Sequence, residues 1–250
     1  MKVKSKLHIL TWGLSLSGLS ILILGSGCGD NVNNRPSSII MGTFSKALGN
    51  LPYHVAKFNK WFEADQGLKG IEIKYTEFND RPSISQAFDS RALQVLYSGD
   101  VPVILCRAQG NDIRTIDVSA VAAQEILVHS DSDILTVQEL RGKRIAVLQG
   151  TTSHYCLLKI LRQNGLKPTD VNLVYMSPAE ARAAFESSQI DAWAVWAPWV
   201  EPQELSGEGR VLKGSDAVIN SIMTIPNYLA ENHPEICGTL VTITQRAKQW

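Results

Sequence analysis

The residues best suited to chemistry lie in a short polar loop between a predicted strand and a predicted helix. The strand is the aliphatic run 144–148, and an apolar pattern over 155–161 predicts a helix that ends at Gly165. The first amides of a helix have no intrahelical partner, and its macrodipole places about half a positive charge there. The loop can therefore bind an anion. The alternative is that Thr152 or Ser153 only caps the helix. The polar residues of this loop are Gln149, Gly150, Thr151, Thr152, Ser153 and His154.

A tryptophan-rich segment follows the loop in the sequence. Trp193, Trp196 and Trp199 fall within seven residues, in a chain with six tryptophans. Trp193 and Trp196 are three apart, so on an extended strand they face opposite sides, and one can pack in the core while the other faces a cleft. Indole walls beside an anion-binding helix suit a ligand with an anionic head and an apolar tail.

The composition restricts the class of protein. The chain has 250 residues, 44% of them hydrophobic, which is enough for one large domain or two small ones. It carries 24 basic and 24 acidic residues, and it contains no basic block. Zero net charge argues against a nucleic-acid partner.

Strand patterns alternate with helix patterns along the chain, which predicts an α/β fold. Strands are predicted over 115–120, 124–129 and 219–225, and a helix is predicted from Pro226 to Glu235. The turn 97–102 predicts a helix start with Asp100 as its N-cap. Ser177-Pro178-Ala179-Glu180 is a capping box with proline at the first helical position, so it predicts another helix.

Three segments together resemble a known family. Gly150-Thr-Thr-Ser-His-Tyr, Pro178-Ala-Glu-Ala-Arg-Ala-Ala-Phe-Glu-Ser and Ile190-Asp-Ala-Trp-Ala-Val-Trp-Ala-Pro-Trp are similar to segments of the solute-binding proteins of ABC importers. The family is the nitrate/taurine/aliphatic-sulfonate group, and the chain is most similar to its aliphatic sulfonate-binding branch. The resemblance covers nearly all the chain after the leader. It implies two α/β lobes with two chain crossovers, the type II periplasmic-binding-protein fold.

The resemblance also implies a function without catalysis, cofactor or metal. An extracytoplasmic binding protein of this kind captures an alkanesulfonate-type anion between its lobes and delivers it to an ABC permease in the membrane for sulfur uptake. A sulfonate stays ionised at neutral pH, so neutral donors and a helix terminus suit it better than a buried lysine does. The expected ligand contacts are Phe44, Ser45, Ser98, Gly99, Asp100, Gly150, Thr151, Thr152, Ser153, His154, Asp191, Trp193 and Trp196.

Several positions depart from the family pattern. Arg91, Gln94 and Leu96 stand where the family usually has Gly, Asp and Gly, and Ala197 replaces a common aspartate. The chain is also short at its C terminus relative to that pattern. It could therefore be a degenerate binder that transports nothing.

The chemistry of the loop also admits a different ligand or a catalytic role. The ligand could be nitrate, or it could be taurine. The ammonium group of taurine would need a carboxylate such as Asp100 or Asp191. The protein could also be a desulfinase-like enzyme of the same fold that uses Cys156, since a helix N-terminus lowers the pKa of a thiol. A buried structural cysteine is the more common role for such a residue.

The N-terminal segment resembles an export signal. Lys2, Lys4 and Lys6 precede an apolar run, and Gly25-Ser26-Gly27-Cys28 resembles a lipoprotein cleavage box. We expect a signal peptide over 1–27, a lipid on Cys28 and a flexible tether over 28–38; ordinary cleavage or an uncleaved anchor is the alternative. The expected lobes are 39–120 for the first part of lobe 1, 121–214 for lobe 2 and 215–250 for the return to lobe 1.

The cysteines predict neither a metal site nor a disulfide framework. If Cys28 carries lipid, then Cys106, Cys156 and Cys237 remain, an odd number with no CxxC spacing.

Overall fold

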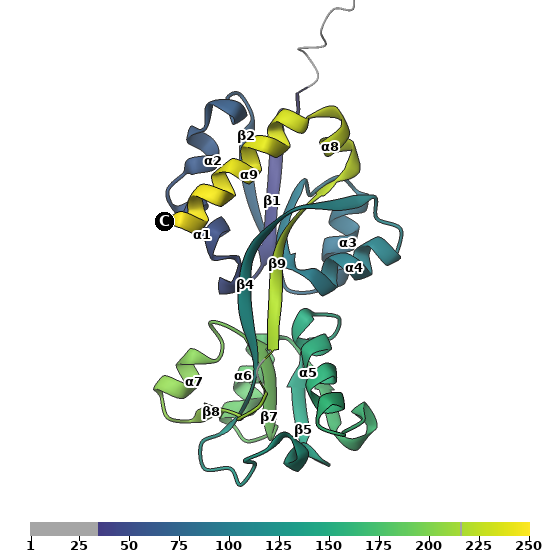
Figure 1. The fold of residues 1–250 in the computed structure, drawn as a ribbon, viewed down its shortest axis with the longest axis vertical. Coiled ribbons are helices and arrows are strands. Elements are labelled where there is room, and N and C mark those ends of the chain that lie inside the picture. The colour runs from purple at the N-terminus through teal and green to yellow at the C-terminus, as the bar shows by residue number, and fades with distance from the viewer. Residues whose placement is uncertain (1–34, 216) are drawn as a thin grey trace, which may run out of the picture. The chain divides into compact units, whose positions relative to one another are not determined.

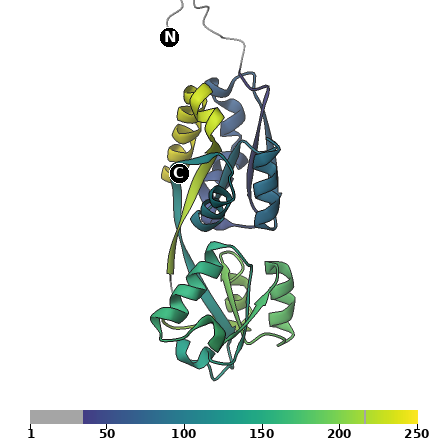
Figure 2. The ribbon, with the colours of Figure 1, turned by 90° about the vertical axis from the view of Figure 1, so that its right-hand side faces the viewer.

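The computed structural model describes residues 35–215 and 217–250. The predicted signal peptide, Cys28 and most of the predicted tether lie outside the described residues. Within residues 35–250, two groups of elements are joined by two long strands, as Figures 1 and 2 both show. We call these groups lobe 1 and lobe 2.

Lobe 1 is built around three parallel strands with helices on both faces. Its helices α1 and α9 pack together over one face, around a core that contains Tyr53, Tyr97 and Leu240. The Tyr97 hydroxyl is 2.8 Å from Thr244 Oγ1, which ties β3 to the C-terminal helix. The elements of lobe 1 are β1 (Ser38–Phe44), η1 (Leu48–Asn50), α1 (Leu51–Phe58), α2 (Trp61–Ala64), η2 (Gln66–Leu68), β2 (Glu72–Phe78), α3 (Arg81–Asp89), β3 (Val95–Gly99), α4 (Asp100–Ala108), α8 (Asn227–Asn232) and α9 (Pro234–Gln249).

Lobe 2 also has three parallel strands at its centre, in the order β7-β5-β6. Its core lies between the sheet and helix α5 on one side, with Leu157 and Leu161 buried, and around Phe185 and Trp193 on the other. The elements of lobe 2 are η3 (Val137–Leu140), β5 (Arg144–Val147), α5 (Thr152–Gln163), η4 (Pro168–Asp170), β6 (Asn172–Tyr175), α6 (Pro178–Glu186), β7 (Ala192–Trp196), α7 (Glu201–Leu205) and β8 (Gly209–Val211).

The two lobes share one continuous sheet, because β4 (Ile113–His129) and β9 (Ala217–Pro226) run through both. These strands pair antiparallel with each other; β9 also pairs with β3 of lobe 1, and β4 pairs with β7 of lobe 2. The described strands follow the order β2-β1-β3-β9-β4-β7-β5-β6, with β8 paired to β4. The predicted α/β fold of two lobes joined by two crossovers is confirmed.

Some details of the predicted elements were wrong. The separate strands predicted over 115–120 and 124–129 are one strand of 17 residues, β4, which absorbs register shifts between Thr115 and Asp117 and between Val118 and Ala120. Residues 121–123, which separate the two predicted strands, also pair with β9, so the strand continues through them. The helix predicted over 226–235 is two helices, because Pro234 begins α9.

The predicted lobe boundaries fall on the shared strands. The boundary between residues 120 and 121 lies inside β4, and the boundary after residue 214 lies just before β9. A strand shared by two lobes offers no single boundary residue, so 39–120, 121–214 and 215–250 stay proposals. In the part of the chain that the structure describes, no helix combines the length and the apolar character needed to cross a membrane.

Glycine at position 42 is required by packing in lobe 1. A Cβ atom there would lie 2.6 Å from Cε2 of Phe78 and 2.9 Å from Cδ1 of Leu93, both buried. We expect Gly42→Ala to lower the free energy of unfolding by about 1–3 kcal/mol, because the core must shift to admit the methyl group. Urea unfolding followed by circular dichroism measures this.

The matched control is Gly238→Ala on the exposed side of α9, where an added Cβ meets nothing within 4 Å. Alanine is the better helix former, so this change should raise the free energy of unfolding by up to about 1 kcal/mol. A neutral or stabilising Gly42→Ala would contradict the packing argument.

Candidate functional site

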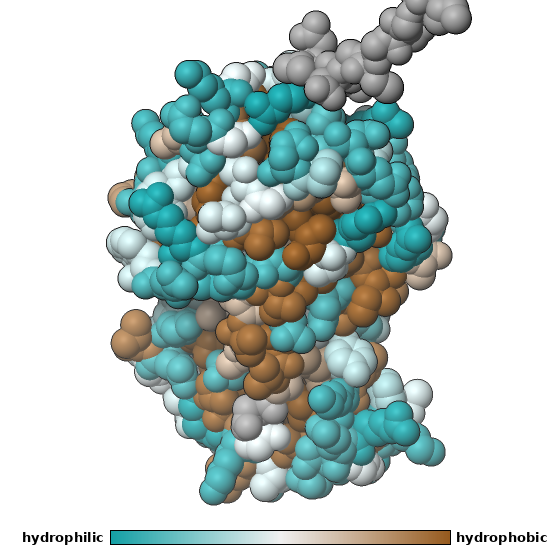
Figure 3. All heavy atoms as spheres, turned by 45° about the horizontal axis from the view of Figure 1, so that its top comes forward, coloured by the Kyte–Doolittle hydropathy of each residue, from teal (hydrophilic) through white to brown (hydrophobic). Residues whose placement is uncertain are grey.

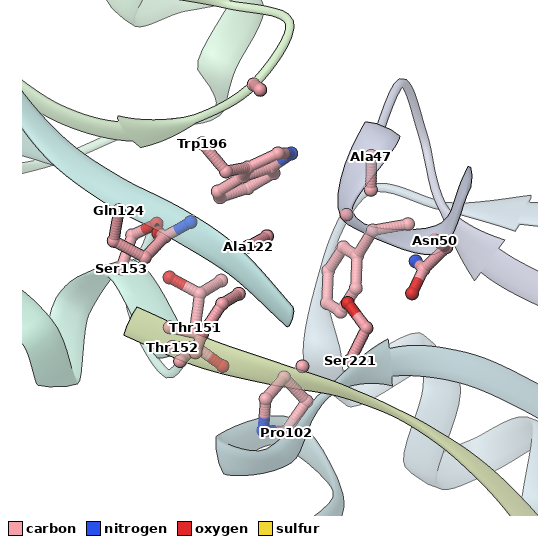
Figure 4. A pocket seen from close by; sticks show the side chains of 15 residues that line it. Ala47, Asn50, Pro102, Ala122, Gln124, Thr151, Thr152, Ser153, Trp196 and Ser221 are labelled. Atoms are coloured by element: carbon pink, nitrogen blue, oxygen red, sulfur yellow. Dashed lines mark hydrogen bonds between the residues drawn. The ribbon is translucent and has the colours of Figure 1, made fainter. Parts of the chain in front are cut away.

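The candidate site lies where strand ends of both lobes face each other. Strands β1 and β3 of lobe 1 and β5 and β7 of lobe 2 all end at this place, as parallel strands do at ligand crevices in open α/β sheets. A cavity of about 480 Å³, open solvent at its mouth included, lies between them. Figure 3 shows apolar side chains gathered where the lobes meet, and Figure 4 shows the cavity walls. Its lining residues are Phe44, Ala47, Gly49, Asn50, Gly99, Pro102, Ala122, Gln124, Thr151, Thr152, Ser153, Trp196, Ala197, Ile219 and Ser221.

The polar loop after β5 forms the wall on the lobe 2 side. Gly150 has φ +75°, in the left-handed region that favours glycine, and the chain turns there into helix α5. The N-cap is Thr151, whereas the capping hypothesis placed it at Thr152 or Ser153. Its Oγ1 accepts the amide of His154 at 3.3 Å and donates to the carbonyl of Leu148 at 2.7 Å.

Two backbone amides at the start of α5 are free to bind an anion. The amides of His154 and Tyr155 are both taken by Thr151, through its hydroxyl and its carbonyl. The amides of Thr152 and Ser153 have no partner among the described residues. They lie in the positive end of the helix dipole and belong to residues that line the cavity.

The three hydroxyl groups of this loop give their protons to protein acceptors. Thr151 donates to Leu148, Thr152 donates to Asp100 Oδ1 at 3.3 Å, and Ser153 donates to Gln124 Oε1. The hydroxyls therefore fix the loop, and the remaining donors are the two amides. The sequence could not show this, because the acceptors of Thr152 and Ser153 are distant along the chain.

The opposite wall comes from lobe 1 and approaches the loop closely. A Cβ atom on Gly99 would lie 2.3 Å from Thr152 Oγ1, so only glycine fits at this point. Asn50 is 2% exposed, and its amide nitrogen donates to Thr43 Oγ1 at 2.7 Å and to the carbonyl of Tyr97 at 3.0 Å. A backbone hydrogen bond from the Leu48 amide to the Ala197 carbonyl, 3.2 Å long, adds a second contact between the lobes.

An aromatic pair closes one end of the cavity. The rings of Phe44 and Trp196 lie edge to face, with centroids 6.3 Å apart. Both side chains also line a second cavity, together with Ser45, Lys46 and Trp199 among others. The indole nitrogen of Trp196 is buried without a hydrogen-bond partner in the described part of the chain, so it is a further neutral donor at this end.

The cavity is electrically neutral at its surface. None of the described residues that line it carries a charged side chain. The described residues also contain no cluster of His, Cys, Asp or Glu that could hold a metal ion. The groups that this cavity offers to an anion are therefore dipoles rather than a cationic partner.

Six of the predicted contact residues line this cavity: Phe44, Gly99, Thr151, Thr152, Ser153 and Trp196. Ser45 lines the neighbouring cavity. Ser98 is buried, and its hydroxyl donates to the Gly99 carbonyl. Asp100 was expected as the N-cap of its helix, but Gly99 is the N-cap and Asp100 is the first residue of α4.

The remaining predicted residues lie farther from the cavity. Gly150 donates its amide to His154 Nδ1 at 3.4 Å, and burial lowers the pKa of His154. Asp191 is held by Arg144, whose hydrogen bonds and positive charge lower the pKa of that carboxyl. Trp193 is 1% exposed and packs against Phe185 in the lobe 2 core.

Sequence reasoning missed the contributions of the shared strands. Gln124 lies on β4, and Ile219 and Ser221 lie on β9, so they reach the cavity only because the sheet is continuous. Asn50 was also missed, although it immediately precedes helix α1. No short-range pattern marks such residues.

The fold and the cavity thus define the class: a two-lobed α/β fold of the binding-protein type, with an uncharged cavity between its lobes. The NMT1/THI5-like family model matches residues 50–250, and the chain belongs to that family. The resemblance seen in the sequence is confirmed.

Individual relatives agree with this class. The chain is 36% identical over 179 residues, 70% of its length, to a protein of Escherichia coli (strain K12) named as an aliphatic sulfonates-binding protein, and the match spans 56% of that protein. The alkanesulfonate-binding protein SsuA from Xanthomonas axonopodis pv. citri bound to MOPS is 28% identical, with a TM-score of 0.72 over 85% of this chain and 73% of that one. The periplasmic aliphatic sulphonate binding protein SsuA from Escherichia coli is 30% identical, with a TM-score of 0.71 and the same coverage.

The environment of Cys156 argues against its use as a nucleophile, which the hypothesis of a desulfinase-like enzyme requires. Its side chain is buried in α5, and burial, with the Asp100 carboxylate nearby, raises the pKa of its thiol to about 11. A raised thiol pKa means less thiolate at neutral pH, so alkylation by iodoacetamide at pH 7.5 should be at least about 100-fold slower than for an exposed peptide thiol. Peptide mass mapping over time measures this for Cys156 alone, and rapid labelling would reopen the nucleophile hypothesis.

Proposed function

We propose that this chain is an extracytoplasmic solute-binding protein that captures a small organic sulfonate between its lobes and delivers it to an ABC permease for sulfur uptake. The observation that carries the proposal is the pair of unpartnered amides at Thr152 and Ser153, in a cavity with no charged residue among its described lining residues and with Trp196 on its wall. The relatives named for sulfonate binding support the same assignment.

The head group of the ligand would meet the start of α5. A sulfonate keeps its charge at neutral pH and offers three oxygens but no proton, so it needs donors only. Two helix amides satisfy it without the desolvation cost of burying a lysine. Gln124 and the Trp196 indole offer further neutral donors on the same walls.

The tail of the ligand would lie along Phe44 and Trp196. Both rings line the cavity at the head group and the neighbouring cavity with Ser45, so an alkyl chain can continue from one into the other. Ser98, Gly150 and His154 would act by shaping the walls. Asp191 and Trp193 would stabilise lobe 2, in which they are held by Arg144 and by Phe185 respectively.

The proposed role involves no catalysis, cofactor or metal. The permease would recognise the closed lobes, as in conformational switching by domain closure. Export and a lipid anchor at Cys28 complete the proposal, and they rest on the N-terminal sequence pattern. Taurine, which is an aminoalkanesulfonate, and nitrate are the ligands against which a simple alkanesulfonate is to be compared.

Gly99 provides a test of lobe closure. Its backbone has φ −61° and ψ 162°, which any residue adopts, so only the contact with Thr152 requires glycine there. We expect Gly99→Ala to weaken binding of butane-1-sulfonate by about tenfold or more, because the lobes cannot approach as closely. Isothermal titration calorimetry measures the affinity, with Gly238→Ala as the control, and an unchanged affinity would exclude this contact from ligand capture.

Trp196 provides a test of the tail contact. Trp196→Ala should reduce the affinity for butane-1-sulfonate by about tenfold, since burial of one aromatic wall contributes about 1–2 kcal/mol. Trp250→Ala is the matched control, because that side chain is 78% exposed. The same titrations with taurine and nitrate compare the candidate ligands, and equal affinities for the Trp196 and Trp250 variants would remove the indole from the site.

A further inference from the structure

We propose that Asp100 is a charge filter that makes the cavity accept monoanions and reject dianions. The inference rests on the proposed function, since it concerns the same anion site. It assigns to Asp100 a role in selectivity rather than in attraction. The expected ligands are organic sulfonates and sulfate monoesters, and the rejected ones are sulfate and hydrogen phosphate.

The carboxylate of Asp100 lies behind the cavity wall, outside the lining residues, and is hydrogen bonded to Thr152, which does line the cavity. Asp100 Oδ1 accepts the amide of Val101 at 2.8 Å and the hydroxyl of Thr152 at 3.3 Å. The first bond belongs to lobe 1 and the second crosses to lobe 2, so the carboxylate is held against the first turn of α5. Thr152 lines the cavity, and its amide is one of the two free donors.

No positive side chain offsets this charge at the described cavity surface. Every described lining residue is neutral, and Asp100 forms no ion pair in the described part of the chain. The helix terminus supplies only about half a positive charge. The field of Asp100 also reaches into α5, where it contributes to the raised thiol pKa of Cys156.

A bound anion is attracted by the amide dipoles of α5 and repelled by the Asp100 carboxylate. On the lobe 1 side, the cation Arg81 has its Nε 3.4 Å from the place of a Cβ on Gly150, outside the cavity lining. Attraction and repulsion both double for a dianion, but the cost of removing the ligand from water rises with the square of its charge. Because Asp100 reduces the net attraction, the cavity offsets the desolvation of a monoanion more readily than that of a dianion. Amide dipoles also satisfy a dianion less completely than they satisfy a monoanion. A site without lysine or arginine thus separates a sulfonate from sulfate by charge, although the two share a tetrahedral head.

The hydroxyl of Thr152 strengthens the same preference. Its proton points to Asp100, so its lone pairs are the part left for a ligand in the cavity. Lone pairs repel an additional anionic oxygen. The close approach of Gly99 keeps Thr152 in this position, which makes the arrangement a property of the contact between the lobes.

The test compares methyl sulfate with sulfate, which share four oxygens around sulfur and differ in charge. Titration calorimetry of the full chain at pH 7.5 and constant ionic strength gives both affinities, with methanesulfonate and butane-1-sulfonate as reference monoanions. We expect the wild type to prefer methyl sulfate by about 100-fold or more, and Asp100→Asn to reduce that preference by about tenfold. Asp133→Asn, at an exposed aspartate outside the cavity lining, should leave the preference unchanged.

Asp100→Ser is a second variant, in which a neutral hydroxyl on a shorter side chain replaces the carboxylate at the start of α4. It should also reduce the preference for methyl sulfate over sulfate. If the wild type prefers methyl sulfate but neither variant changes the ratio, the filter is not Asp100. A wild type that binds sulfate as tightly as methyl sulfate would overturn the inference outright. Failure of the proposed function is distinguishable, because butane-1-sulfonate would then not bind to the wild type.

Discussion

The close approach of Gly99 to Thr152 is the contact on which the arrangement of the cavity depends. It brings the end of β3 in lobe 1 against the first turn of α5 in lobe 2. Any side chain at position 99 would hold these two elements apart. With glycine there, the Thr152 hydroxyl reaches Asp100, and the walls of the cavity come from both lobes.

The cavity is neutral because none of its described lining residues is charged, and most of its hydroxyl donors are used within the protein. The three hydroxyls of the loop are donors to protein acceptors, which fixes the loop and leaves two amides for an anion. A lysine in their place would bind anions more strongly, but it would discriminate less among them and would cost more to desolvate. Dipoles fixed by the fold offer moderate attraction with defined geometry, which suits a protein that must also release its ligand.

The continuous sheet connects the cavity to the rest of the molecule. Strands β4 and β9 carry Gln124 and Ser221 into the cavity walls and also form the link between the lobes. A change in the twist or bend of these strands therefore moves cavity residues and lobes together. The register shifts in β4 lie in the lobe 1 part of this link, and irregular pairing of this kind allows a long strand to bend.

Local sequence patterns determined the elements that present the site. The aliphatic run at 144–148, the glycine at 150 and the capping box at 177–180 predicted β5, its turn and α6, because caps, turns and periodicity act over a few residues. Tertiary structure decided the rest, since the partners of Thr152, Ser153 and Asn50 are distant in the sequence. The tertiary structure also decided that Thr151 caps α5, which acceptors the hydroxyl groups donate to, and that Trp196 rather than Trp193 faces the cavity. These outcomes depend on which groups the folded chain brings within hydrogen-bonding or van der Waals distance.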